Sequence, residues 1–573
     1  MTLSVFSVRR RSRRRPSLAL AGLVLSLLAP LPLQGLTLTG PVLGVATNFG
    51  QHWQPAMLAA ARQLPARNFR DEVYWTDVER NGVFSFGRME TRFPEMIAAE
   101  GATMSLLVNN GNPGYDDGHT PHSADAIAAF ARFAAKTVQR FPAITSVEVG
   151  NEFNSQDFVS GPVKADGLTA RAMDDLRLLT AVHDAVKAVA PKVRILGGGV
   201  HSIPVGFLAP MFAAGAAQKM DALAIHTYTT PAEQLVRQIA VLRQLPGMAE
   251  MPIDVTEFGE EKAAKAPGHL LRNYCQMALS GVERAIWYDL NPRGDGMTPL
   301  IDGAGHVTPV GQTYRMISAL MEGRPAQDAA PDPFTYACRF GPGTLVIWGA
   351  PRALRLATPG LKVLDDTGAP LAPAGLQLSQ TDPLVITGPG LILLGRDVIL
   401  GPQSVLADTF DQYAYPGLPG QPQDPFDRFA LMDGARLPLE THGGQDRGSV
   451  PWTPYRGAKG VFTARLMADV LLPSDYGPKK VAIVQSYRAP KDMRVVARIA
   501  LDPRWHTKDG VAFTLALNGR SLVEKIVQRA WTETTEPIAL RAGDRLSFTV
   551  GPNGNDIGDT SVYRFTLLTP PSG

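Results

Sequence analysis

The chain has 573 residues, which is too long for one domain, and its 45% hydrophobic content excludes wholesale disorder. Its formal charge of +3 depends on six arginines among the first 15 residues, and without them the charge is −3. The basic character therefore belongs to the N-terminal segment, and no nucleic-acid partner is expected.

The first 36 residues are typical of an export signal. Their arginines are followed by an apolar run over residues 18–33, which is shorter than the roughly 20 residues that span a membrane. We therefore expect a secreted or periplasmic protein. In the alternative, the segment stays uncleaved and anchors the protein to the inner membrane, since no clear cleavage site follows it.

Short apolar runs alternate with helical patterns between residues 40 and 325. The expected strands are residues 42–48, 68–71, 104–109, 147–152, 193–197, 221–228, 253–257 and 284–288. Eight such strands, each followed by a helical connection, predict a (β/α)8 TIM barrel. A doubly wound open sheet would also alternate, but no glycine-rich phosphate loop follows the first strand.

Beyond residue 325 the helical pattern ends and strands are separated by Gly, Pro and Asp turns. Residues 326–402 predict a small β-sandwich, and residues 403–573 a second, jelly-roll-like β-sandwich that either binds carbohydrate or braces the barrel. Cys275 is expected on a helix and Cys338 on a strand of the next domain. A disulfide between them is possible but is not expected.

Two of the predicted barrel strands end on a glutamate. Glu152 ends the fourth strand and Glu257 ends the seventh. The carboxyl ends of barrel strands open onto one face, where active sites lie, so the two side chains should converge. Hydrolysis of a glycosidic bond uses such a carboxyl pair. Either glutamate alone is more simply a surface residue, but both at strand ends, in this order and spacing, indicate catalysis.

With these residues the chain resembles the clan A glycoside hydrolases, which are retaining (β/α)8 enzymes. It is most similar to family 39-like members, including bacterial exopolysaccharide glycosidases. The resemblance is carried by Asn151-Glu152, by Glu257, and by Arg70, His226-Thr227-Tyr228 and Trp287. It implies that Glu152 is the acid/base and that Glu257 is the nucleophile.

The expected substrate-binding residues are Asn151, Arg70, His226, Tyr228, Trp287, Trp75 and Asn109. Asn151 would bond the sugar 2-hydroxyl, and the indoles would stack on sugar rings. Simpler alternatives remain, since Arg70 could be structural, His226 a core histidine and Trp75 a packing residue. Glu148 is expected to point into the barrel and pair with a buried cation.

These observations predict a retaining glycosidase that acts on a β-linked polysaccharide or oligosaccharide through a covalent glycosyl-enzyme. The ten histidines do not cluster at ligand spacing, so neither a metal nor another cofactor is expected. Two alternatives are a non-catalytic polysaccharide-binding or assembly protein and a transglycosylase, which would use the same intermediate. A membrane contact is expected only through an uncleaved N-terminal segment.

Overall fold

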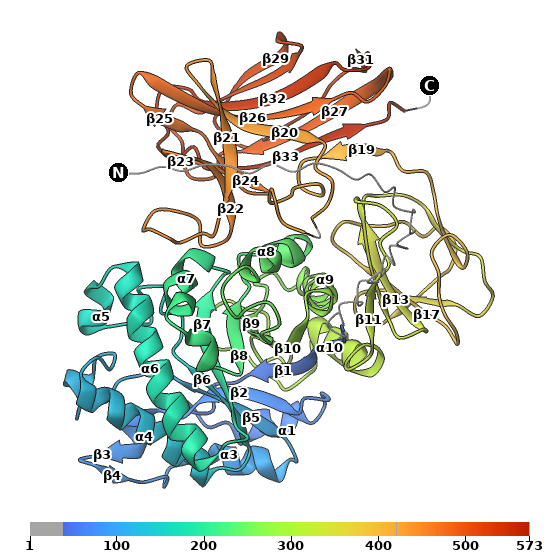
Figure 1. The fold of residues 1–573 in the computed structure, drawn as a ribbon. Coiled ribbons are helices and arrows are strands. Elements are labelled where there is room, and N and C mark those ends of the chain that lie inside the picture. Colours follow the sequence, from blue (N-terminus) through green and yellow to red (C-terminus); the bar gives the residue numbers. More distant parts are fainter. Residues whose placement is uncertain (1–37, 420, 572–573) are drawn as a thin grey trace, which may run out of the picture. The chain divides into compact units, whose positions relative to one another are not determined.

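A computed structural model describes residues 38–419 and 421–571 of the chain (Figure 1). The predicted export segment, residues 1–36, lies outside the described residues. Within the described ranges, every helix is too short or too polar to cross a bilayer. These residues belong to one compact unit.

Eight parallel strands close into a barrel, as the sequence predicted. They are β1 (Val42–Ala46), β2 (Asn68–Glu72), β5 (Thr103–Val108), β6 (Ile144–Val149), β7 (Arg194–His201), β8 (Ala222–His226), β9 (Ile253–Phe258) and β10 (Val282–Trp287). All five residues of β8 are buried. Burial on both faces explains why such strands read as continuous apolar runs.

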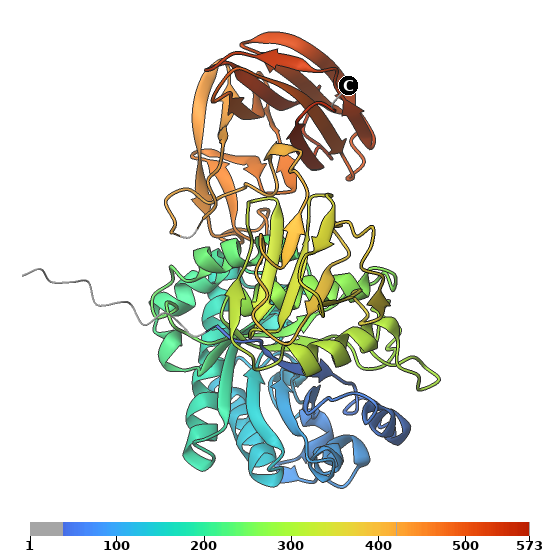
Figure 2. The same ribbon diagram turned by 90° about the vertical axis from the view of Figure 1, so that its right-hand side faces the viewer.

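Helices surround these strands (Figures 1 and 2). They are α1 (Pro55–Ala61), α2 (Trp75–Val78), α3 (Met89–Ala99), α4 (Ala124–Arg140), α5 (Gly161–Ala165), α6 (Leu168–Val189), α7 (Val205–Ala213), α8 (Leu235–Leu242), α9 (Ala266–Leu279) and α10 (Pro309–Leu320). Minor elements are β3 (Glu79–Arg80), β4 (Val83–Phe84) and the 3-10 turns η1 (Asp116–Gly118), η2 (Ala216–Gln218) and η3 (Ala232–Gln234).

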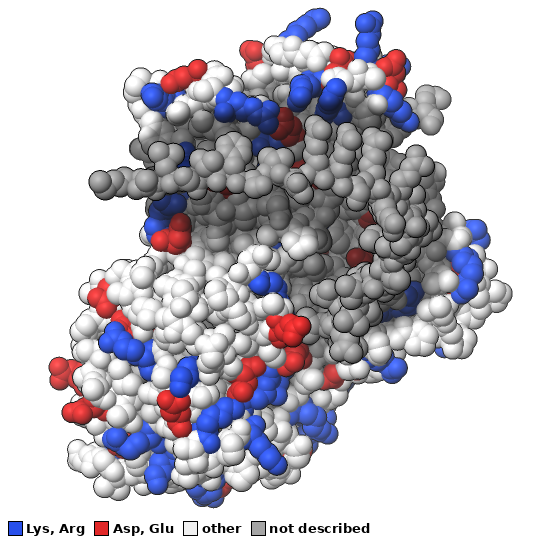
Figure 3. All heavy atoms as spheres, in the orientation of Figure 1, with Lys and Arg blue, Asp and Glu red and all other residues white. Residues whose placement is uncertain are grey.

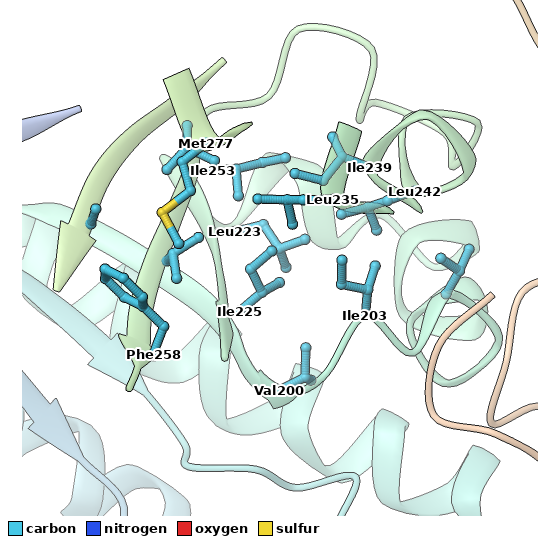
Figure 4. Close-up of a cluster of buried hydrophobic side chains, with 14 of the residues drawn as sticks. Val200, Ile203, Leu223, Ile225, Leu235, Ile239, Leu242, Ile253, Phe258 and Met277 are labelled. Atoms are coloured by element: carbon cyan, nitrogen blue, oxygen red, sulfur yellow. The ribbon is translucent and has the colours of Figure 1, made fainter. Parts of the chain in front are cut away.

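The packing between α8 and its neighbouring strands shows why the helical face is apolar. Leu235 and Ile239 of α8 point toward Leu223 and Ile225 of β8 (Figure 4). All four side chains belong to one continuous buried cluster. Leu235 and Ile239 are four residues apart along α8, which places both on the face that covers the barrel.

Two antiparallel sheets follow the barrel. The larger contains β11 (Ala326–Asp328), β12 (Thr335–Phe340), β13 (Thr344–Gly349), β15 (Lys362–Leu364), β16 (Pro370–Leu371) and β17 (Leu384–Thr387). The smaller pairs β14 (Leu354–Leu356) with β18 (Val398–Leu400). The strands β11 and β12 pack against α9 of the barrel, and they belong to the yellow-green region of Figure 2.

The C-terminal strands form one antiparallel network. They are β19 (Val405–Asp408), β20 (Phe426–Met432), β21 (Ala435–His442), β22 (Tyr455–Ala458), β23 (Val461–Leu466), β24 (Val470–Leu472), β25 (Ser474–Tyr476), β26 (Lys479–Arg488), β27 (Met493–Asp502), β28 (Val511–Leu517), β29 (Arg520–Val527), β30 (Trp531–Thr534), β31 (Ile538–Leu540), β32 (Arg545–Pro552) and β33 (Ser561–Leu568). The predicted alternation appears in β28, where Val511, Phe513 and Leu515 are buried. The predicted fold class, a barrel followed by antiparallel β regions, is confirmed.

A disulfide joins the barrel to the sheet that follows it. Cys275 of α9 and Cys338 of β12 are bonded, with their Cα atoms 5.9 Å apart. The expectation that these cysteines stay unpaired is therefore wrong. The sequence placed one on a helix and one on a strand, but it carried no signal that α9 packs against β12.

Replacing both cysteines with serine is expected to lower the free energy of unfolding by about 2–4 kcal/mol, because the bond restricts the unfolded chain. Thermal unfolding under non-reducing conditions measures the change. A reducing agent should bring the wild-type midpoint to that of the double variant. Equal midpoints for both proteins without reductant would contradict a stabilising bond.

Candidate active site

Glu152 and Glu257 lie together at the face where the barrel strands end. Glu257 belongs to β9, and Glu152 follows the end of β6. One carboxylate oxygen of each, together with a ring nitrogen of His226, lies within 4.8 Å of the others. The structure therefore brings the two glutamates into the proximity that the sequence predicted.

A tight turn fixes the position of Glu152. Gly150 has a φ of 81°, and a side chain there would place its Cβ 2.9 Å from the ring of Phe153. Glu152 itself has a φ of 46°, in the left-handed region that costs a residue with a side chain roughly 1–3 kcal/mol. Its backbone N–H donates to the carbonyl of Gly199, 2.6 Å away. The neighbouring strand β7 thus supports the turn that places Glu152 near Glu257.

Arg70 connects Glu257 to a buried carboxylate. Its Nε donates to Glu148 at 2.6 Å, and its Nη1 donates to Glu257 at 2.7 Å. Thr256 also donates to Glu148. Burial opposes the charge of Glu148, but Arg70 and His226 outweigh it and lower the pKa of Glu148 to about 2. The predicted pairing of Glu148 with a buried cation is confirmed.

Tyr228 holds the other oxygen of Glu257. Its hydroxyl donates to Oε2 at 2.9 Å, while Arg70 donates to Oε1. Burial and the charge of Glu257 raise the pKa of Tyr228 well above its ordinary value, so the phenol remains a donor. Two donors from different strands therefore fix the orientation of this carboxylate.

Two histidines hold Glu152. Nδ1 of His226 lies 2.8 Å from Oε1 of Glu152, and Nδ1 of His201 lies 3.2 Å from the same oxygen. Burial opposes the charge of His226, but the carboxylates of Glu257, Glu148 and Glu152 raise its pKa to about 9. Burial raises the pKa of Glu152, yet the two histidines lower it to about 2. At neutral pH the proton shared by this pair therefore sits on His226.

A cavity of about 320 Å³ opens beside Glu257, within the usual size range of ligand pockets. It is lined by Thr47, Gln51, Arg70, Asp71, Glu72, Tyr74, Leu107, Asn109, Asn110, Asn151, Phe158, Glu257, Tyr288 and Arg293. Asn109 and Asn151, both predicted, share its wall, and the side-chain oxygen of Asn109 accepts from the Asn151 N–H at 3.0 Å. Amides, carboxyls and hydroxyls dominate this lining, which suits a ligand rich in hydroxyl groups.

The two predicted tryptophans do not reach the cavity. Trp75 is buried, stacks on Tyr115, and donates its indole N–H to Glu79 at 2.6 Å. Trp287 is buried and donates to the carbonyl of Thr298 at 3.0 Å. Both are packing residues here, so the expectation that they stack on a sugar is wrong.

Several residues of this site were not predicted. His201 was missed because the glycines at 197–199 predicted that β7 ends there, whereas the strand continues to His201. Tyr288 lines the cavity in place of its neighbour Trp287, and it was missed because the resemblance assigned the aromatic residue of the eighth strand to Trp287. Arg293 lies in a loop, and its sequence gives no signal of its proximity to Glu257.

The ligand atoms of Glu152, His226 and Glu257 are close enough to hold a metal ion, but hydrogen bonds from neighbouring side chains already engage them. Arg70 and Tyr228 donate to both oxygens of Glu257, and His226 bonds Glu152. We therefore expect dialysis against EDTA to leave the rate of glycoside hydrolysis unchanged. A loss of rate that Zn²⁺ or Mn²⁺ restores would contradict this prediction.

Comparison with known proteins bears on the activity. Residues 153–314 match the family model described as the glycosyl hydrolase catalytic core. This segment contains β7, β8, β9 and β10, and with them His201, His226, Tyr228 and Glu257. No curated protein sequence matches the chain.

Several solved structures are similar to this chain. A GH39 β-xylosidase from Caulobacter crescentus is 16% identical, with a TM-score of 0.45, over 61% of this chain and 98% of that chain. A GH39 enzyme from Xanthomonas axonopodis pv. citri is 12% identical, with a TM-score of 0.43, over 90% and 96%. A family 30 subfamily 8 xylanase from Clostridium acetobutylicum is 14% identical, with a TM-score of 0.43, over 61% and 98%. At these identities and TM-scores the likeness carries no argument about the fold or the substrate of this chain.

The family match covers the half of the barrel that holds Glu257 and the residues around it. The prediction of a glycoside hydrolase is confirmed at this level. The chain therefore carries a glycosyl hydrolase catalytic domain and is a glycosidase.

Proposed function

We propose that the protein is a retaining glycoside hydrolase of the clan A type, which cleaves β-linked polysaccharide or oligosaccharide by double displacement. The separation of Glu152 and Glu257 carries this proposal. Retaining enzymes hold their carboxyl groups about 5–5.5 Å apart, whereas inverting enzymes hold them about 6.5–9.5 Å apart to admit a water. One oxygen of Glu152 and one oxygen of Glu257 lie within 4.8 Å of each other, and this proximity supports the first class.

In the first step, an oxygen of Glu257 attacks the anomeric carbon and the bond to the leaving oxygen breaks. The leaving oxygen takes a proton from Glu152, which receives one from His226 across their 2.8 Å hydrogen bond. In the second step, Glu152 removes a proton from water, whose oxygen bonds the anomeric carbon as the bond to Glu257 breaks. That proton returns to His226.

The tendency of His226 to release its proton depends on whether Glu257 is charged. This charge is one cause of the raised pKa of His226, and it disappears when Glu257 forms an ester with the sugar. The pKa of His226 therefore falls during the same step in which Glu152 protonates the leaving group. In the second step, the lowered pKa keeps Glu152 ionised, and the proton that Glu152 takes from water passes on to His226.

We expect kcat/KM to fall as the pH rises through about 9, since the pair formed by His226 and Glu152 then loses its proton. Below that pH the pair keeps the proton that the leaving group needs. In the variant His226→Asn, the alkaline limb should move down by about one unit or more. The pH profile of kcat/KM reports these groups in the free enzyme. If the alkaline limb lies at the same pH in the wild type and in His226→Asn, another group causes it.

The proposed substrate is a glycan without a required charge, and bacterial exopolysaccharide is one such class. Basic and acidic side chains are interspersed on the visible face of the barrel, with no large region of one sign (Figure 3). The first 36 residues support the further proposal that the protein acts in the periplasm or outside the cell. The order of arginines and apolar residues supports export, with an uncleaved inner-membrane anchor as the other outcome.

The test is a panel of purified β-linked polysaccharides and oligosaccharides incubated with the wild-type protein and with Glu257→Ala. Release of reducing ends by the wild type alone, with sizing of the products, supports the proposal and shows endo or exo action. Products longer than the substrate would indicate transglycosylation. Equal release by both proteins would overturn the proposal.

A further inference from the structure

A loop of the C-terminal β region lies against the barrel beside Glu152. The loop, residues 443–454, connects β21 to β22. Gln445 and Asn154 exchange two hydrogen bonds: Asn154 Nδ2 donates to Gln445 Oε1 at 2.7 Å, and Gln445 Nε2 donates to the Asn154 carbonyl at 2.8 Å. Both side chains are buried. The loop is therefore fixed to the barrel by specific polar contacts.

The barrel leaves no space for a side chain where the loop backbone approaches. The N–H of Gly206 in α7 donates to the carbonyl of Gly444 at 2.8 Å. A Cβ added at Gly206 would lie 2.4 Å from that carbonyl oxygen, so the backbone of the loop would have to move. Glycine at position 206 thus permits the loop to contact the barrel.

These contacts lead directly to the acid/base position. Asn154, which holds the loop, also accepts from the His201 N–H at 2.9 Å and donates to the His201 carbonyl at 3.0 Å. The ring of His201 lies 3.2 Å from Glu152. Trp452 of the loop packs edge-on against the same ring, with centroids 5.2 Å apart and planes at 88°. One histidine therefore contacts both Glu152 and the C-terminal loop.

A second cavity, of about 440 Å³, opens on this side of Glu152. The barrel contributes His201, Ser202, Thr229, Pro231, Gln234 and Gln238. The C-terminal region contributes Pro451, Trp452, Thr453 and residues 467–470. This cavity shares no lining residue with the one beside Glu257. Its aromatic and apolar wall differs from the polar lining of the first cavity.

A substrate placed for the proposed reaction would extend from the first cavity toward the second. Under the proposed function, on which this inference rests, the sugar attacked at its anomeric carbon occupies the cavity that contains Glu257. The leaving oxygen must reach Glu152, so the leaving portion of the substrate extends past Glu152. His201 lies there, and the second cavity begins at His201.

We propose that the second cavity is the subsite for the leaving sugar, with Trp452 of the C-terminal region as its stacking surface. The ligand is a neutral pyranose ring of a β-linked oligosaccharide. Its apolar C–H face would lie on the half-buried indole, and its hydroxyls would meet Thr229. The C-terminal β region is then part of the active site, and the barrel alone lacks one wall of it.

Binding without turnover tests this proposal first. β-1,4-linked tetrasaccharides of glucose, xylose and mannose are titrated calorimetrically into Glu257→Gln and into Glu257→Gln with Trp452→Ala. The tetrasaccharide that binds should lose about tenfold or more in affinity without the indole. A matched control adds Trp505→Ala, since Trp505 is 67% exposed and lies outside the cavity. Equal affinity with and without Trp452, or no binding in the whole panel, overturns the subsite.

Kinetics then separate the leaving-sugar subsite from the rest of the site. For the tetrasaccharide that binds, Trp452→Ala should lower kcat/KM at least tenfold more than it does for the methyl β-glycoside of the same sugar, whose leaving group needs a proton but has no ring. Gly206→Val, which displaces the loop, should give the same pattern. Equal losses on both substrates would place Trp452 outside the leaving-group side and overturn the proposal.

These binding and kinetic experiments also distinguish a failure of the subsite from a failure of the proposed function. Binding that depends on Trp452, together with no hydrolysis by the wild type, would leave the subsite standing and remove the proposed function. Equal rates of hydrolysis by the wild type, Trp452→Ala and Gly206→Val would support the function and overturn the subsite. Thermal midpoints of the two variants within a few degrees of wild type show that the fold is retained.

Discussion

The variant Glu257→Ala is expected to lose hydrolysis almost completely, with kcat reduced roughly 10⁴- to 10⁶-fold, as for removal of other enzymatic nucleophiles. Arg70 and Tyr228 both hold this carboxylate, and without it no oxygen is placed to attack the anomeric carbon. Added azide fits the space left by the carboxylate and should restore turnover of a substrate with an activated leaving group. Because azide then attacks in a single displacement, the glycosyl azide should have the inverted configuration.

A matched control separates this loss from a general effect on the loop after β9. Glu261 is exposed and lies four residues beyond Glu257, so Glu261→Ala should keep the wild-type rate. Arg70 retains its bond to Glu148 in Glu257→Ala, so the fold should persist. Undiminished hydrolysis by Glu257→Ala, or a retained azide product, would remove Glu257 from the nucleophile role.

Replacing Glu152 with alanine should lower kcat/KM about 10²- to 10⁴-fold for substrates with a sugar leaving group, the usual contribution of a general acid. The loss should be much smaller for a glycosyl fluoride, because fluoride leaves without a proton. In the proposed mechanism Glu152 is also the base of the second step, so such substrates should show a burst followed by slow turnover. Azide should relieve the slow step and give the retained glycosyl azide, opposite to the product of Glu257→Ala.

The opposite azide products make the two variants an internal test of the assignment. Asp157→Ala is the control on the Glu152 side, since Asp157 is exposed and lies five residues further on. It should leave both substrates unaffected. An equal loss on the fluoride and on the oligosaccharide in Glu152→Ala would show that Glu152 does not protonate the leaving group.

The strand-end glutamates could be located from sequence because buried parallel strands leave a simple pattern. Apolar runs such as β8 and β9 are buried on both faces, and the polar residue that ends each run opens onto the same side of the barrel. Counting eight runs was therefore enough to pair Glu152 with Glu257. The pairing of Glu148 with a buried cation followed from the same alternation, and the structure identifies that cation as Arg70.

The features that sequence missed depend on packing between distant segments. Trp75 and Trp287 are of a residue type that often stacks on sugars. Only their burial in the structure shows that they are packing residues. Trp452 reaches His201 because a loop of the C-terminal region contacts the barrel, and no local pattern records a contact over that separation. The disulfide depends in the same way on α9 packing against β12.

The central claim is that Glu257 forms a covalent intermediate and that the configuration at the anomeric carbon is retained. The most direct measurement is the proton NMR spectrum of the first product formed by the wild-type protein, recorded before the sugar equilibrates in solution. A β-anomer from a β-linked substrate is the predicted result. An α-anomer would mean single displacement by water, and it would contradict the account.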